Sequence, residues 1–182
     1  MLASKEKEKT CSLLLVFARN AIVAAVRGTD APVAPDAAIL KEHRGVFVTL
    51  TRAGRLRGCI GRIRGDVPLS SLLPLIAAMS ATDDPRFPAV LSHELDALHV
   101  EISLLTVPAL LKGPATIEIG RHGLLVFARG RRGVLLPQVA AEHGWSVDEF
   151  LAQTCRKASL PPDAWRQAGA RVHTFETEII AE

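Results

Sequence analysis

Residues 45–62 read GVFVTLTRAGRLRGCIGR, and this stretch decides the fold class of the chain. Its first eight residues are rich in β-branched side chains, which is typical of a strand. Residues 53–54 then supply a turn, and residues 56–63 return as a second strand. The stretch therefore predicts an antiparallel β-hairpin, around which the rest of the chain is interpreted.

The return strand of this hairpin carries an unusual mixture of side chains. Because side chains alternate between the two faces of a strand, Arg55, Arg57 and Cys59 would share one face. Leu56 and Ile60 would then lie on the other face. The alternation thus predicts guanidinium groups and a thiol that point the same way.

Two glycines interrupt the return strand on either side of Cys59. A glycine inside a strand often marks a bulge, or a place where a ligand or another backbone comes close. We therefore expect Gly58 and Gly61 to clear space beside the thiol.

The remaining periodicities predict several helices and further strands. Thr10 is expected to cap the first helix and Gly28 to end it, and Ser146 with Glu149 forms a capping-box pattern. Helices are expected at residues 10–27, 36–42, 68–81, 138–143 and 146–158, and strands at 99–106, 116–119, 124–128, 134–136 and 171–180. This order predicts an α+β fold, a mainly antiparallel sheet with flanking helices, within one domain spanning residues 1–182.

Composition and charge place the chain among ordinary globular proteins. It has 48% hydrophobic residues and a formal net charge of +3, a modest basic excess. The chain has three widely spaced cysteines and no Cys-x-x-Cys pair, so a zinc knuckle is not indicated. Their odd number and wide spacing favour a reducing compartment. The apolar run at residues 13–18 is shorter than the roughly 20 residues that a membrane span needs. We therefore expect a cytoplasmic protein that does not enter a membrane.

Cys59 is the strongest candidate for chemistry. Nearby arginines stabilise a thiolate, and backbone amides freed at a glycine-flanked bulge could bind an oxyanion. The alternative is that Cys59 is a small buried apolar residue and that the arginines are a solvated strand edge. A nucleophilic cysteine normally needs a base, and His122, in a tight turn, is the candidate among six histidines.

Metal and nucleic-acid sites have weaker support. His93, Glu94, His99 and Glu101 fall close together but without a His-Glu-x-x-His spacing, so no metal site is predicted and the cofactor is left unidentified. Residues 120–123 match the Gly-x-x-Gly loop of KH domains, but their flanks read as strands rather than helices. A small anionic ligand explains the basic hairpin as well as a polynucleotide does.

The hexapeptide Leu-Arg-Gly-Cys-Ile-Gly at residues 56–61 resembles the signature of the AMMECR family, which is named for a human chromosomal region. Other segments resemble the family in the expected order along nearly the whole chain. They lie at residues 45–50, 84–87, 101–106, 120–124, 135–140, 142–145 and 155–158.

The resemblance implies an α+β fold with a larger and a smaller lobe, and a cleft between them that the signature lines. It implies no particular reaction. In prokaryotes the family often accompanies Memo-like and radical-SAM proteins, which implies a shared pathway. Human relatives are discussed as adaptor or developmental proteins.

The leading hypothesis is a cleft that binds a small anionic or carbonyl-bearing ligand, with Cys59 as nucleophile. Arg57 would hold the anion and stabilise the thiolate, and the site would be completed by Gly58, Gly61, Arg86, Glu101 and His122. One alternative is a non-catalytic binding or scaffold module for a protein partner or a nucleotide-like metabolite. A second alternative is an RNA-binding module. The sequence predicts neither the substrate nor the oligomeric state.

Overall fold

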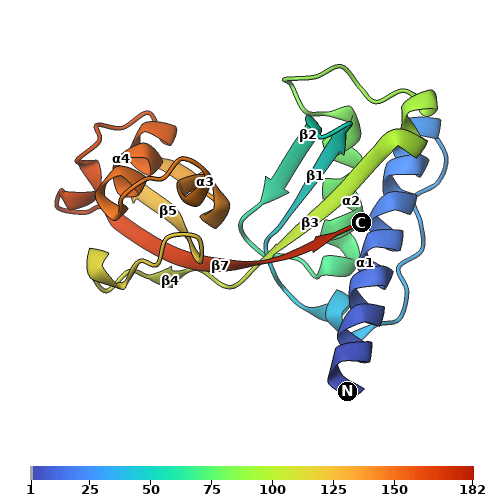
Figure 1. Cartoon of the computed structure of the whole chain (residues 1–182), viewed down its shortest axis with the longest axis horizontal. Coiled ribbons are helices and arrows are strands. Elements are labelled where there is room, and N and C mark those ends of the chain that lie inside the picture. Colours follow the sequence, from blue (N-terminus) through green and yellow to red (C-terminus); the bar gives the residue numbers. More distant parts are fainter. Residues whose placement is uncertain (1) are drawn as a thin grey trace. The chain divides into compact units, whose positions relative to one another are not determined.

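The computed structural model describes residues 2–182, with side chains from residue 5 onward, and divides them into two compact units (Figure 1). The first unit contains the chain up to Leu104 together with Glu178–Glu182, and the second is Leu105–Thr177. Seven strands form a sheet in the order β2 (Arg55–Arg62), β1 (Val46–Arg52), β3 (Leu98–Leu105), β7 (Arg171–Ala181), β5 (His122–Ala128) and β6 (Arg131–Leu135), and β4 (Ala109–Leu110) lies beside β7. The pairing is antiparallel for β1–β2, β1–β3, β4–β7, β5–β6 and β5–β7. The α+β class is thereby confirmed, whereas the cleft between two lobes stays a prediction.

In the first unit, helices cover one face of three strands. The strands are β1 (Val46–Arg52), β2 (Arg55–Arg62) and β3 (Leu98–Leu105), and the helices α1 (Leu2–Arg27) and α2 (Leu69–Thr82) lie on one side of them (Figure 1). The core between these layers includes Leu14, Phe17, Ile22, Val48, Leu50, Leu72, Ile76 and Ile102. We call the opposite side of β1–β3 the open face, because neither α1 nor α2 covers it.

Helix α1 begins earlier than the sequence predicts. Thr10 is not a cap, because the helix runs through it and its hydroxyl donates to the carbonyl of Glu6 at 2.9 Å. A threonine inside a helix commonly bonds to the carbonyl four residues back. Gly28, with a φ of +66°, follows the last helical residue as predicted.

The same helix is long and apolar enough over Lys5–Arg27 to cross a membrane, judged by length and composition alone. Its apolar positions also have a second explanation. Leu14, Phe17, Ala21 and Ile22 are buried against the sheet and α2, so the helix supplies one side of the core. Cytoplasmic localisation stays a prediction.

The β1–β2 hairpin contains a bulge that changes the register. Leu50 pairs with Gly58 but Thr51 pairs with Leu56, which leaves Arg57 as an extra residue on β2. Such a bulge bends a strand and re-aims the side chains beyond it.

The bulge exchanges the predicted faces of the β2 side chains that precede Arg57. Cys59 lies on the open face and Ile60 packs on the core, as expected. Beyond the bulge, Leu56 shares the open face with Cys59, and Arg55 falls on the face of Leu50. The prediction that Arg55 and Cys59 share a face is therefore wrong.

The second unit has its own strands, helices and core. Its strands are β4 (Ala109–Leu110), β5 (His122–Ala128), β6 (Arg131–Leu135) and most of β7 (Arg171–Ala181), and its helices are α3 (Pro137–Glu142) and α4 (Val147–Lys157). Ser146 and Glu149 make the predicted capping box at the start of α4. Its core includes Leu124, Val126, Phe150, Leu151, Cys155 and Val172.

Short 3-10 helices replace two predicted elements. The predicted strand at residues 116–119 is wrong, because Thr116 ends a 3-10 turn at Pro114–Thr116 and the carbonyl of Glu118 accepts from the N–H groups of Arg121 and His122 in a tight turn. The predicted helix at 36–42 is a single 3-10 turn at Ala38–Lys41. Two further 3-10 turns are Ser92–Ala97 and Ala164–Arg166.

Candidate functional site

Cys59 stands in a row of polar side chains across the open face. It pairs with Thr49 on β1, and Thr49 pairs with Glu101 on β3. The Thr49 hydroxyl donates to the Cys59 sulfur at 3.4 Å. All three residues are half-buried. The thiol is therefore oriented by a neighbouring hydroxyl and is not sealed into the core under α2.

A buried carboxylate holds the backbone at Cys59. The N–H of Cys59 donates to Oδ2 of Asp84 at 2.8 Å, and the N–H of Arg86 donates to Oδ1 at 3.1 Å. Asp84 is only 5% exposed. A buried carboxylate is stable only when its oxygens accept hydrogen bonds, and the two backbone N–H groups supply some of them.

The guanidinium of Arg86 completes the arrangement. Its Nε and Nη2 donate to the two oxygens of Asp84 at 2.9 Å and 2.7 Å, and Nη2 also donates to the carbonyl of Cys59 at 3.2 Å. The side chain of Arg86 is nevertheless 54% exposed. The guanidinium also lies over the ring of Phe87, with 5.6 Å between its Cζ and the ring centroid, so it is a partly exposed group beside Cys59.

Asp84 and Arg86 each shift the pKa of the other. The guanidinium of Arg86 is the main reason that the pKa of Asp84 lies well below its usual value. In return, Asp84 raises the pKa of Arg86, with smaller contributions in the same direction from Cys59. Because the carboxylate neutralises the guanidinium, the pair offers an oriented N–H donor beside the thiol and little net positive charge.

Arg57 has a different set of partners. Its Nε and Nη2 donate to the carboxylate of Glu94 at 3.1 Å and 2.9 Å, and its Nη1 and Nη2 donate to the carbonyls of Pro88 and Ala89 at 2.9 Å and 3.2 Å. Every nitrogen of this guanidinium therefore binds the protein itself. The predicted role of Arg57 as an anion ligand stays a prediction that must compete with these bonds.

Glu94 is the acceptor at the centre of this second ion pair. It is 6% exposed, and it also accepts from Arg52 at 2.9 Å and from the N–H of Leu91 at 2.9 Å. Arg57 is the largest cause that lowers the pKa of Glu94 to about 2. The ion pair between Arg57 and Glu94 therefore connects the segment before β3 to the bulge of β2.

The two glycines that flank Cys59 are explained by close packing. A Cβ on Gly58 would lie 2.0 Å from the carbonyl oxygen of Ser80 in α2. A Cβ on Gly61 would lie 2.0 Å from the ring of Phe47 on β1. The protein itself fills both spaces, and a ligand-binding role for Gly58 and Gly61 stays a prediction.

His122 belongs to the second unit, where it opens β5. Its Nδ1 accepts from the N–H of Glu118 at 2.9 Å, and its Nε2 lies 4.0 Å from a carboxylate oxygen of Glu176. The first contact fixes Nδ1 as the acceptor, so a neutral ring carries its proton on Nε2. The pairing of His122 with Cys59 stays a prediction.

Across the described part of the chain, residues 2–182, no three His, Cys, Asp or Glu side chains come together as a metal-binding group. Of the four residues weighed for a metal, Glu94 is held by arginines, Glu101 lies in the row with Cys59, and His93 and His99 are exposed.

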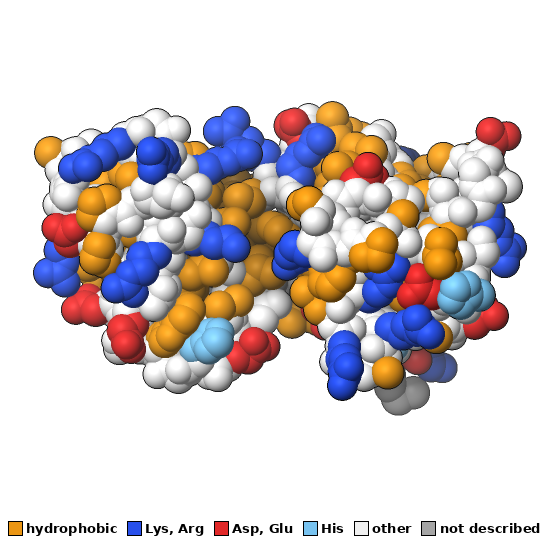
Figure 2. Space-filling view, turned by 90° about the horizontal axis from the view of Figure 1, so that it is seen from above, with side chains coloured by type: hydrophobic (Ala, Val, Ile, Leu, Met, Phe, Trp, Pro, Cys, Tyr) orange, Lys and Arg blue, Asp and Glu red, His pale blue; other side chains and the backbone are white. Residues whose placement is uncertain are grey.

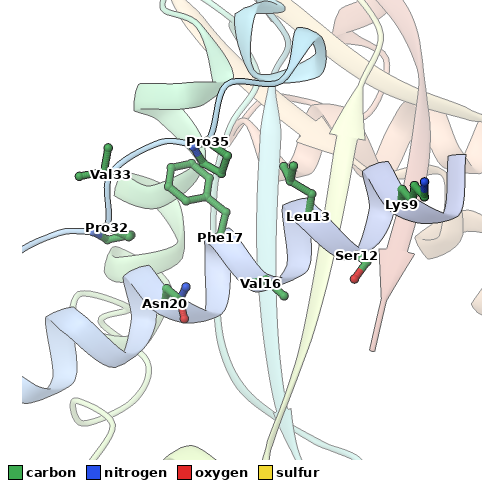
Figure 3. A pocket seen from close by; sticks show the side chains of 9 residues that line it. All are labelled: Lys9, Ser12, Leu13, Val16, Phe17, Asn20, Pro32, Val33 and Pro35. Atoms are coloured by element: carbon green, nitrogen blue, oxygen red, sulfur yellow. The ribbon is translucent and has the colours of Figure 1, made fainter. Parts of the chain in front are cut away.

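Two hollows lie elsewhere on the first unit. One, of about 370 Å³, lies between α1 and the loop that follows it, where Phe17 points toward Pro32 and Pro35 (Figure 3). The other, of about 390 Å³, is lined mainly by charged and apolar side chains that include Cys11, Arg44 and Glu178. Neither is lined by a site residue that the sequence predicted.

Sequence reasoning missed two members of the site, Thr49 and Asp84. In a hairpin without a bulge, Thr49 would pair with Gly58. The bulge shifts the register by one residue, so Thr49 pairs with Cys59 instead. The motif Asp84-Pro85-Arg86 does contain a signal, because an aspartate two residues before an arginine can bind both its backbone N–H and its guanidinium.

Comparisons with known proteins find a matching family model, similar sequences and a similar fold. The AMMECR1 family model matches residues 15–180. A protein of Methanothermobacter thermautotrophicus is 44% identical over 177 residues, which cover 93% of this chain and 92% of the relative. Protein TK0174 of Thermococcus kodakarensis is 48% identical over 153 residues, covering 79% and 75%. The crystal structure of the uncharacterized protein PH0010 from Pyrococcus horikoshii superposes with a TM-score of 0.85 at 43% identity, covering 91% of this chain and 88% of that one.

Proposed function

Since the chain belongs to the AMMECR1 family, we propose that its function resides on its Leu-Arg-Gly-Cys-Ile-Gly strand, where the open face binds a small carbonyl-bearing or anionic ligand beside Cys59. One observation carries this proposal. The buried carboxylate of Asp84 holds both the backbone of Cys59 and the guanidinium of Arg86, so a thiol and a partly exposed guanidinium are fixed next to each other.

Arg86 replaces Arg57 as the group that would meet the ligand. Every nitrogen of the Arg57 guanidinium binds Glu94 or a backbone carbonyl, and its side chain is 14% exposed, whereas the side chain of Arg86 is 54% exposed. Because Asp84 neutralises Arg86, the donor suits the oxygen of a carbonyl at least as well as a full anion. Thr49 and Glu101 would contact the rest of the ligand along the polar row.

The chemistry open to such a site is addition of the thiol to a carbonyl. The Cys59 sulfur forms a bond to the carbonyl carbon, and the π pair of the C=O bond moves to the oxygen near Arg86. The thiol proton leaves to solvent, and the oxygen takes a proton from solvent. The product is a hemithioacetal, so no oxidant or reductant is needed.

Alkylation by iodoacetamide tests the reactivity of Cys59. Cys11 serves as an internal reference, because it is also a half-buried thiol of the first unit, and Cys155 is fully buried. We expect Cys59 to react several-fold faster than Cys11 at about pH 7. Arg86→Gln should remove most of that difference, because it leaves the carboxylate of Asp84 without its counter-ion beside the thiol. Peptide mass spectrometry gives the rate at each cysteine in one sample.

A Cys59 that reacts no faster than Cys11 removes the nucleophile and leaves the non-catalytic binding module as the better hypothesis. Under that alternative, Cys59→Ser keeps ligand or partner binding, whereas a cysteine enzyme carrying the same change loses turnover.

RNA binding has less support. On the face that Figure 2 shows, Lys and Arg side chains are interspersed with acidic and apolar ones and do not form a continuous stripe. Nucleic-acid binders usually concentrate their basic residues in a stripe or patch. An affinity for RNA that hardly changes with salt would exclude this mode, since phosphate contacts are strongly salt-dependent.

A further inference from the structure

Strand β2 has one edge without a neighbouring strand. It is the last strand in the sheet order, pairs with β1 alone and lies outermost among the three strands of the first unit (Figure 1). An edge strand presents backbone N–H and C=O groups that the sheet itself does not use. Because β2 carries Cys59, a group that pairs with this edge comes close to the thiol.

The contacts of Cys59 show which backbone groups lie on the free edge. Its N–H donates to Asp84 and its C=O accepts from Arg86, so both groups point away from β1. In an antiparallel ladder, residues that exchange hydrogen bonds with the partner strand alternate with residues whose groups point to the opposite edge. The register is regular from Gly58 to Arg62. The N–H and C=O of Gly61, two residues after Cys59, therefore point to the free edge as well.

Cys59 and Gly61 differ in what meets them on this edge. At Cys59 the edge is closed by Asp84 and Arg86. Gly61 is half-buried, and its outward N–H and C=O form no hydrogen bond within the described residues. Strand β6 of the second unit is also an edge strand, so a free edge alone marks no site. The edge of β2 is distinguished by its closed end, where a partly exposed guanidinium and a thiol lie together.

We propose that this edge binds the C-terminal tail of a polypeptide, which pairs with Gly61 as an added antiparallel strand and ends beside Cys59 and Arg86. The proposal rests on the function proposed above and identifies its carbonyl-bearing ligand as the end of a peptide chain. Addition of an extended peptide to a free sheet edge is a common mode of recognition, in which main-chain hydrogen bonds supply the affinity. One residue of the tail exchanges two hydrogen bonds with Gly61.

The direction of the added strand follows from the groups at the closed end. An antiparallel chain brings its C-terminus to Cys59, whereas a parallel chain would bring its N-terminus there. The oxygens of Asp84 already accept from Cys59 and from both the backbone and the guanidinium of Arg86. The side chain of Arg86 is 54% exposed, and it is a donor, which suits a terminal carboxyl group and not an ammonium group, itself a donor.

The ring of Phe47 favours an apolar residue in the tail. Residues directly opposite each other in a sheet place their side chains on the same face. A Cβ on Gly61 would lie 2.0 Å from the ring of Phe47, so the ring covers the open-face side of Gly61. The tail residue opposite Gly61 therefore places its side chain beside a half-buried aromatic ring. Because β2 ends at Arg62, the preceding part of the tail leaves the edge and its length is not restricted.

Titration with a pentapeptide, followed by amide NMR of the whole chain, tests this edge. The probe is an N-acetylated peptide of alternating valine and threonine with a free carboxyl group. We expect saturable shifts centred on Gly61 and Cys59. The Gly61 N–H should also exchange more slowly with solvent, because it gains a hydrogen bond.

Methylation of single peptide nitrogens in the probe is the matched control. Successive N–H groups of an added strand point alternately toward β2 and away from it. Methylation at the residue that pairs with Gly61 should weaken binding at least about tenfold, because a hydrogen bond is lost and a methyl group enters between the strands. Methylation at the residue on either side should change the affinity less than about twofold. These probes leave the protein unchanged, so the comparison does not depend on the folding of a variant.

Arg86→Gln tests the closed end of the edge. It should weaken binding about tenfold, the loss expected when one charge-assisted hydrogen bond is removed. Arg55→Gln, which changes an exposed arginine at the other end of β2, should bind the probe as the parent does. A peptide with a free ammonium group and a C-terminal amide should bind more weakly than the probe, because its end groups suit the opposite direction.

The same five residues at the end of a flexible tail on a folded carrier protein should bind as the free peptide does. Loss of binding on the carrier, tighter binding of the peptide with exchanged end groups, equal effects of methylation at successive positions, or shifts centred away from Gly61 overturn the proposal. Rapid alkylation of Cys59 in a protein that binds no peptide removes the added strand and keeps the nucleophile. Slow alkylation with intact peptide binding removes the nucleophile and keeps the added strand.

Discussion

The backbone N–H of Cys59 donates to a buried carboxylate oxygen of Asp84 at 2.8 Å, although the two residues are 25 positions apart in the sequence. Strand β2 pairs with β1 on one side only, so a backbone donor on its other edge must find a partner elsewhere. Asp84 provides that partner and at the same time orients Arg86. The loop after α2 therefore sets the surroundings of the thiol.

Asp84→Asn should destabilise the protein by about 2–4 kcal/mol. The amide keeps the shape of the side chain but removes the charge that Arg86 neutralises, and its NH2 group turns a donor toward a donor. Urea denaturation measures the free energy of unfolding. The alkylation rate of Cys59 should change in the same variant, because Arg86 loses its anchor.

Asp83→Asn is the control for this change. Asp83 is the exposed neighbour of Asp84, and its contact is to the adjacent hydroxyl of Thr82. We expect an effect within about 0.5 kcal/mol, as for most surface substitutions. Equal losses in the two variants would contradict the role assigned to Asp84.

Arg57→Ala should cost about 2–4 kcal/mol, because it leaves the buried carboxylate of Glu94 with Arg52 as its remaining cation. Arg55→Ala, two residues earlier and exposed, should change stability by no more than about 0.5 kcal/mol. Thermal or urea unfolding of the two variants gives the comparison. An Arg57→Ala protein as stable as Arg55→Ala would contradict the structural role of Arg57 and favour its predicted role as a ligand group.

The sequence predicts the elements of this fold better than their register. The β1–β2 hairpin is predictable because β-branched residues and a glycine turn are local signals. The bulge at Arg57 is not, because it depends on how closely β2 approaches the backbone of Ser80 in α2. One unpaired residue was enough to move Arg55 to the other face.

The site is predictable only in part, because its hydrogen bonds join residues that are far apart in the sequence. Cys59 is recognisable within its hexapeptide, but its partner Asp84 comes from a distant loop, and the pairing depends on tertiary structure. Arg57 shows the same dependence on distant residues. The sequence indicates a cation near the thiol, whereas the carboxylate that holds the guanidinium, Glu94, lies 37 positions away.

The acid sensitivity of the protein should follow the two buried carboxylates. The pKa of Asp84 and of Glu94 are both lowered by their arginines, from usual values of 3.8 and 4.5. The unfolded chain therefore binds more protons below about pH 4.5, and the stabilisation is lost as the pH falls through the folded pKa of Glu94 at about 2. Above about pH 5, both contributions are fully present.

Glu94→Gln isolates one part of this dependence. The difference in unfolding free energy between the parent and the variant should be constant above about pH 5 and should shrink steadily as the pH falls toward 2. Urea denaturation at a series of pH values measures it. Two curves that stay parallel down to the lowest pH would show that the folded protein does not lower the pKa of Glu94.

Gly58→Ala should be among the most damaging single substitutions in the hairpin. The added Cβ would meet the carbonyl oxygen of Ser80 at 2.0 Å, and this oxygen belongs to the backbone of a packed helix that cannot rotate away. We expect a loss of at least about 2 kcal/mol. Gly61→Ala should cost less, because the group it meets is the ring of Phe47, which can turn about its own side-chain bonds.

Gly113→Ala separates this packing effect from the general effect of replacing glycine. Gly113 has a φ of 173°, an extended conformation open to any residue, and a Cβ there meets nothing within 4 Å. Its replacement should change stability by less than about 1 kcal/mol, in either direction. We therefore expect the free energy of unfolding to be highest for Gly113→Ala, lower for Gly61→Ala and lowest for Gly58→Ala. A Gly58→Ala protein as stable as Gly61→Ala would mean that α2 can move away from the strand that carries Cys59.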